Sequence, residues 1–111
     1  PSRFVKATMF ASNSLPMKNG EELIGQVFHI LNQFDIPLGL VRDKQKGKTM
    51  YDHTWYTNVK DPHELKYYYK TYEDSDVKFV DLHQFEWEAK KIKSMKVKGS
   101  EKETDMSSSL R

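Results

Sequence analysis

The sequence lacks several features that mark familiar classes of protein. It has no cysteine among its 111 residues, so a disulfide framework, a cysteine zinc site and a cysteine nucleophile are excluded for this chain. Apolar residues make up only 37%, and no apolar run approaches the roughly 18 residues that a membrane-spanning helix needs. No basic segment leads into an apolar run, as it would in a secretory signal. We therefore expect no membrane partner and favour a cytoplasmic location; since the chain begins with Pro1, we also expect it to be processed or cut from something longer.

An excess of one charge sign is also absent. Lys and Arg number 18 against 16 Asp and Glu, a formal net charge of +2, which lacks the basic footprint of a nucleic-acid-binding protein. The four histidines never occur at the i, i+4 spacing of a helical metal site, so no metal or other cofactor is expected. Aromatic residues are plentiful at 13%, which excludes a disordered class for most of the length.

Two segments in the first third have helical periodicity. Residues 2–13 carry a narrow apolar stripe at helical spacing, formed by Phe4, Val5, Thr8 and Met9, which we expect to be buried. Residues 20–34 begin with a capping pattern, Asn19 followed three positions later by Glu22. The apolar face of this second helix is expected to comprise Leu23, Val27, Ile30, Leu31 and Phe34, widened by Ile24 and Phe28.

The middle of the chain changes to the period of two that is typical of strands. After a charged segment at 43–48, expected to be a solvated loop, alternation predicts strands at 52–59, 65–72 and 77–82. Short turns join these strands, which indicates a three-stranded antiparallel meander. Tyr67 and Tyr69 fall on one face of the second strand, and Tyr68 and Tyr72 on the other. Since apolar groups on both faces of a sheet need cover, the chain is expected to be part of a larger layered structure.

The chain is expected to end in two segments of different character. Residues 84–98 form a lysine-rich extension, and residues 99–111 have almost nothing to bury and are expected to be disordered. A lysine-rich run is usually a solvated face.

Four sequence pieces in this order carry a resemblance to a known family. They are Ser2-Arg3-Phe4-Val5-Lys6, then Val27-Phe28-His29-Ile30-Leu31, then Tyr67-Tyr68-Tyr69 through Thr71-Tyr72, and lastly Val80-Asp81-Leu82. Over residues 2–83 the chain resembles the C-terminal portion of the choloylglycine hydrolases, the group of bile salt hydrolases and penicillin V acylases. These are N-terminal-nucleophile hydrolases that cleave linear amide bonds.

The resemblance implies a fold, a site residue and partners. The fold would be α+β, part of a four-layer αββα sandwich with two helices packed on the three-stranded meander, and residues 1–83 would form the C-terminal portion of the hydrolase domain. Arg3 matches the family's catalytic arginine, which lies beside an N-terminal cysteine nucleophile and lowers the pKa of its thiol. The implied partners are the missing upstream part of the same domain, a small-molecule amide such as a conjugated bile salt or an acylated penicillin, and further copies in a homo-oligomer. Since the chain has no cysteine, it is expected to be inactive alone.

Other interpretations of the same residues stay open. Arg3 could cap or salt-bridge a helix start, and the chain could be a non-catalytic remnant or scaffold. The run Tyr67–Tyr69 with Lys66 and Lys70 could stack on single-stranded nucleic acid in a small αβ binding module, although cross-strand packing is the commoner role of such tyrosines. Pro1 could act as the base of a tautomerase, but the β-α-β order of that fold is missing.

Overall fold

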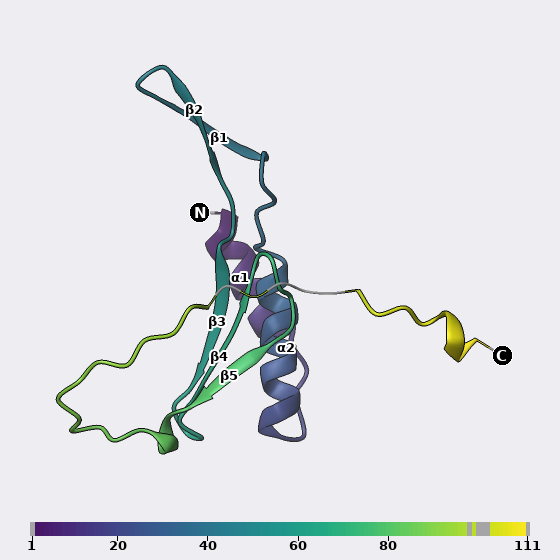
Figure 1. Ribbon diagram of the computed structural model, residues 1–111. Coiled ribbons are helices and arrows are strands. Elements are labelled where there is room, and N and C mark those ends of the chain that lie inside the picture. Colours follow the sequence, from purple (N-terminus) through teal and green to yellow (C-terminus); the bar gives the residue numbers. More distant parts are fainter. Residues whose placement is uncertain (1, 98, 100–102, 111) are drawn as a thin grey trace.

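The computed structural model describes residues 2–97, 99 and 103–110, and it has an α+β fold (Figure 1). The elements are α1 (Ser2–Asn13), α2 (Gly20–Asn32), β1 (Val41–Gln45), β2 (Lys48–Asp52), β3 (Tyr56–Asp61), β4 (Lys66–Thr71), β5 (Lys78–Asp81) and two 3-10 turns, Leu82–Gln84 and Ser107–Ser109. Pro1 and part of the tail expected at 99–111 lie outside the described residues.

Both expected helices are present. The side chain of Asn19 accepts a hydrogen bond of 2.9 Å from the backbone N–H of Glu22, which caps α2 as predicted. The carboxylate of Glu22 accepts from the N–H of Lys18 rather than from that of Asn19, so the second half of the capping box is shifted by one residue. Helix α2 ends at Asn32, and Phe34 follows it in the turn.

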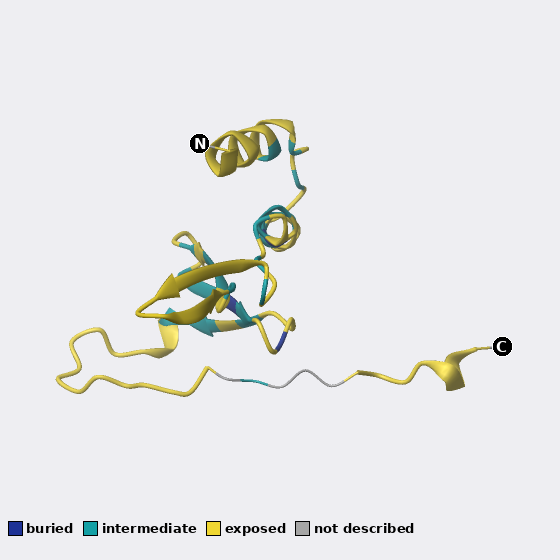
Figure 2. Cartoon of the chain, turned by 90° about the horizontal axis from the view of Figure 1, so that it is seen from above, coloured by how far each residue is buried: buried dark blue, intermediate teal, exposed yellow. Residues whose placement is uncertain are grey.

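The expected burial of the apolar stripe of α1 is wrong. Phe4, Val5 and Met9 are 77%, 55% and 61% exposed, and Thr8 is exposed too. The physical reason is the order of the layers: α1 lies against α2, and α2 lies between α1 and the sheet (Figure 2). A single neighbouring helix cannot cover the stripe.

Strands β3, β4 and β5 form the predicted antiparallel meander in the order β3-β4-β5. Strand β3 begins at Tyr56, later than alternation predicted, because the N–H of Thr54 donates to the backbone oxygen of Ile36 and not to a neighbouring strand. Opposite pairs include Asn58 with Tyr69 and Tyr67 with Val80.

The segment expected as a solvated loop at 43–48 is instead part of a β-hairpin. Strands β1 and β2 pair from Val41–Asp52 to Gln45–Lys48 around a two-residue turn. Lys46 and Gly47 have φ of 50° and 77°, the left-handed backbone of the turns that suit hairpin twist. Every residue of both strands is exposed, so the segment is solvated as expected but is not a loop.

Helix α2 covers one face of the meander (Figure 2). Lys70 of β4 points to this side, where its Nζ bonds the side-chain oxygen of Asn32 and lies 5.9 Å from the ring centroid of Phe28. Tyr67 and Tyr69, whose ring centroids lie 6.3 Å apart, occupy the opposite face, which we call the far face.

The buried core is thin. The buried apolar residues of the described chain are Phe28, on the side of α2 that faces the sheet, and Tyr69, on the far face. They are 6% and 9% exposed. Leu23, expected on the buried face of α2, is 51% exposed. The accessible surface is 10275 Å², whereas a folded protein of 13.1 kDa exposes roughly 6,400 Å². Much apolar surface on α1 and on the sheet is therefore left open.

Candidate functional site

Arg3 lies in the first turn of α1, where it is exposed. Its guanidinium carbon lies 5.5 Å from the ring centroid of Phe34, which is close enough for a cation–π contact. This contact holds the head group at the edge of a depression of about 260 Å³, lined by Ser2, Arg3, Lys6, Gln33, Phe34, Asp35 and Ile36. Among the described residues, Arg3 forms no ion pair and no hydrogen bond through its head group.

Lys6 shares this depression but has a structural explanation. Its Nζ donates a hydrogen bond of 2.8 Å to the backbone oxygen of Gln33, beyond the last turn of α2, and lies 5.4 Å from the ring centroid of Phe34. A cation at a helix C-terminus is stabilised by the helix dipole and satisfies a carbonyl without an intrahelical partner. Lys6 therefore fastens α1 to α2.

The position of Arg3 is not explained by the stability of its own helix. A cation in the first turn opposes the helix dipole at a cost of about 0.3–1 kcal/mol. Helix α1 has no acidic residue in its first turn that would offset this cost. The expected alternative, in which Arg3 salt-bridges the helix start, has no partner among residues 2–97, 99 and 103–110. Arg3 is thus a free guanidinium beside an aromatic ring.

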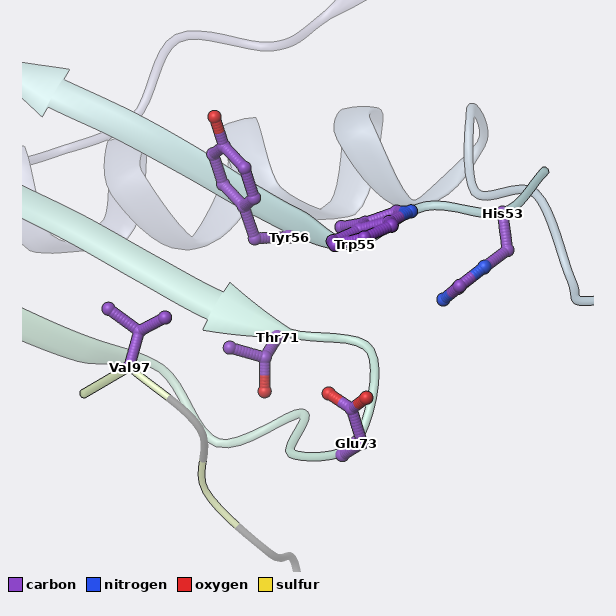
Figure 3. Close-up of a pocket in the computed structure, with 6 residues that line it drawn as sticks. All are labelled: His53, Trp55, Tyr56, Thr71, Glu73 and Val97. Atoms are coloured by element: carbon purple, nitrogen blue, oxygen red, sulfur yellow. The ribbon is translucent and has the colours of Figure 1, made fainter.

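A second cavity, of about 380 Å³, opens where β3 begins and β4 ends. Its lining residues are His53, Trp55, Tyr56, Thr71, Glu73 and Val97 (Figure 3). The rings of His53 and Trp55 stack with centroids 5.7 Å apart, and Tyr72 meets His53 edge-on at 4.8 Å. The buried Nδ1 of His53 and Oγ1 of Thr71 have no hydrogen-bond partner in the described chain. Sequence reasoning did not place these residues together, because they converge only after β3 and β4 pair.

The two cavities flank one bridge between distant segments. The N–H of Thr54 donates to the oxygen of Ile36 at 3.0 Å, and the N–H of Ile36 donates to Oγ1 of Thr54 at 2.8 Å. Ile36 lines the depression beside Arg3, whereas His53 and Trp55 line the second cavity. The bridge joins the segment that follows α2, against which Arg3 lies, to the segment that precedes β3.

The rim of the second cavity continues into a fixed acidic turn between β4 and β5. Asp74 is 5% exposed, and its carboxylate accepts from Lys78 Nζ at 2.6 Å and from the N–H of Asp76 at 3.1 Å. The hydrogen bond from Lys78 holds the pKa of Asp74 below its ordinary value, against the opposing effect of burial. The pKa of Asp81 is lowered mainly by the N–H of His83, with a further contribution from its ring.

In the described part of the chain, no group of three acidic or histidine side chains is placed so that it could hold a metal ion. His29 is exposed on α2. None of the described helices is long and apolar enough to cross a membrane.

Comparison with known proteins decides the family. The sequence model of the linear amide C–N hydrolases, choloylglycine hydrolase family, matches residues 1–95. The chain belongs to the choloylglycine hydrolase family. The family match continues past residue 83, where the resemblance read from the sequence ended, and takes in most of the lysine-rich extension.

Two curated proteins are similar to the chain, and the name of the first agrees with the family assignment. The chain is 37% identical over 81 residues to a bile salt hydrolase/transferase of Lactiplantibacillus plantarum, covering 73% of this chain and 24% of that protein. It is 30% identical over 78 residues to an uncharacterized protein of Paramecium bursaria Chlorella virus 1, covering 68% of this chain and 28% of that protein. The chain thus spans about a quarter of the length of these two relatives.

Proposed function

We propose that this chain is the C-terminal segment of a linear-amide hydrolase and that Arg3 is its active-site arginine. The observation that carries the proposal is the position of Arg3. The resemblance of Ser2-Arg3-Phe4 to the family motif implies that Arg3 corresponds to the family's arginine; Arg3 also opposes the dipole of its own helix and has no anionic partner among the described residues. A guanidinium placed in this way is ready for an anion that another part of the domain supplies.

In the proposed reaction the chain stabilises charge and does not attack the substrate. A cysteine thiolate from the upstream portion attacks the amide carbonyl carbon, the carbon–nitrogen bond breaks, the amine leaves with a proton, and water releases the acid. Arg3 would lower the pKa of that thiol and stabilise the negative charge that develops. The chain contains no cysteine, so we expect no turnover from it alone.

The substrate class follows from the family: a small linear amide, such as a conjugated bile salt or an acylated penicillin. The first partner is the upstream portion of the same domain. The open apolar surface of the chain supports such a partner, because a complete small domain would bury more of it.

The test joins this chain to an upstream portion that carries an N-terminal cysteine, and measures release of glycine from a conjugated bile salt. Arg3→Lys should lower turnover about 100-fold, because a flexible ammonium cannot reproduce the planar fork of a guanidinium. Lys6→Arg is the matched control, since it keeps the charge that fastens α1 to α2 and should keep near-full turnover.

Three results would contradict the proposal. Turnover by the isolated chain would show that the nucleophile lies elsewhere than proposed. Near-full turnover of Arg3→Lys in the joined protein would make the arginine structural. No turnover in any combination would favour the non-catalytic remnant instead.

A further inference from the structure

The C-terminal segment turns back and crosses the far face of the meander. In Figure 2 this segment lies on the side of the sheet opposite to the helices. Met95 meets the end of β5 in a cavity of about 320 Å³ that is lined by Val80, Leu82, Phe85, Lys93, Ser94 and Met95. Val97 then lies over the middle of the sheet, in a cavity of about 150 Å³ lined by Tyr56, Tyr67, Tyr69, Thr71 and Val97.

Three consecutive residues, Lys93, Ser94 and Met95, line the cavity at β5, and the next residue of the segment to line a cavity of the sheet is Val97. Met95 and Val97 line cavities of the sheet, whereas Lys96 between them lines none of these and is exposed. Val97 also lines the larger cavity beside His53 and Trp55. Through these shared cavities the segment lies beside residues of β3, β4 and β5.

A third contact lies at the acidic turn. Gly99 packs so closely on Asp74 that a Cβ at position 99 would overlap the carboxylate. The carboxylate cannot easily retreat, because Lys78 and the N–H of Asp76 hold it in place. Position 99 therefore has no room for a side chain larger than that of glycine.

We propose that residues 93–97 form a removable strap, which covers the far face of the sheet until the rest of the hydrolase replaces it. The replacement step rests on the function proposed above, whereas the docking of the strap does not. Tyr69, the buried apolar residue of the far face, is the side chain that such a cover protects.

The strap is held in a way that permits release. Met95 and Val97 remain 62% and 55% exposed, so each inserts only in part. Within the described chain, residues 93–97 form no hydrogen bond with the sheet. A cover held by shallow apolar contacts is displaced by a larger apolar surface, since the hydrophobic contribution grows with the area buried.

Docking is tested by the reactivity of one introduced thiol. Thr71→Cys places a thiol of similar size where the buried Oγ1 of Thr71 lies under Val97, in a chain that has no other cysteine. The rate of reaction with N-ethylmaleimide, a neutral reagent, is measured in the full chain. Adding Val97→Gln should raise this rate at least tenfold, and Lys96→Gln, the matched control, should leave it unchanged.

Gly99→Ala is a second, independent variant, since its added methyl group meets Asp74 and not the cavity. It should also raise the rate, with unchanged far-UV circular dichroism. Equal rates in all four proteins would overturn the docking of the strap. If the rates rise and circular dichroism shows that the sheet has unfolded, the strap is part of the fold and is not removable, which also overturns the proposal.

Displacement of the strap is measured in a separate experiment, in which the chain is mixed with the upstream portion and the appearance of hydrolase activity is followed. Val97→Gln should raise the rate at which hydrolase activity appears, because the competing cover is weakened, and Lys96→Gln should not. An unchanged rate in Val97→Gln would refute displacement. If no activity appears with any variant, the proposed function fails, while the thiol measurement still decides whether the strap docks.

Discussion

Replacing Phe28 by alanine should disrupt the packing of α2 on the meander and so destabilise the fold. Phe28 is 6% exposed, and the Nζ of Lys70 lies 5.9 Å from the centroid of the Phe28 ring. A phenylalanine side chain of roughly 200 Å² contributes up to about 5 kcal/mol when it is buried, and compactness of the unfolded chain lowers this value by roughly 10–40%. We therefore expect Phe28→Ala to lower the free energy of unfolding by about 3 kcal/mol, which agrees with the cost of such truncations in other cores.

The assay is urea unfolding followed by far-UV circular dichroism, with Phe4→Ala as the matched control. Phe4 is 77% exposed, so its removal should cost less than about 1 kcal/mol. Because Phe28 and Tyr69 are the buried apolar residues of the described chain, Phe28→Ala is expected to lose its helical signal at low urea or in water. A loss below about 1 kcal/mol would refute the reasoning, since α2 would then not depend on the sheet for its stability.

Three further outcomes are expected. In the joined hydrolase, Arg3→Lys should leave the melting temperature unchanged while turnover falls, since among the described residues the head group has a cation–π contact with Phe34 and no ion pair; a fall in melting temperature would contradict this. Because the pKa of Asp74 is lowered in the fold, the ionised carboxylate stabilises the fold above the ordinary value of 3.8, and this contribution is lost as pH falls through the folded-state pKa. Asp74→Asn should therefore be less stable than the parent at pH 7. The difference in unfolding free energy should shrink in acid titrations below pH 3.8. Gly47→Val should speed hydrogen exchange of the β1–β2 amides, because φ of 77° strains a β-branched residue, and should leave the exchange of β4 amides as it was; slowed or unchanged exchange in the hairpin would refute the turn.

Local patterns in the sequence predicted the elements that depend on local physics. The Asn19 cap, the helical spacing that follows it and the period of two in the tyrosine strand are each encoded within a few residues, and α2 and the meander were confirmed. The charge of residues 43–48 predicts a solvated loop and not the hairpin, although Lys46-Gly47, a glycine after a polar residue between short runs, is a known hairpin signal.

Features that depend on contacts between segments far apart in the sequence could not be predicted from local patterns. The stripe of α1 has the pattern of a buried face, yet Phe4 is open, because burial depends on which layer lies beside the helix. The pairing of Lys6 with the oxygen of Gln33 and the closeness of Val97 to Tyr69 depend on chain reversals that leave no local trace. The role of Arg3 stays a prediction from the family motif.

The β1–β2 hairpin has a consequence for handling the protein. It projects beyond the layers as a ribbon (Figure 1), and its outer strand edges have no neighbour in the described chain. Unpaired edges invite strand-to-strand association between molecules, and natural proteins discourage it with charged side chains, lysine above all. Arg42, Asp43, Lys44 and Lys48 supply such charges here. Acetylation of the hairpin lysines would remove part of that protection, so a preparation with neutralised lysines should form ribbon-like aggregates at concentrations where the untreated protein stays dispersed.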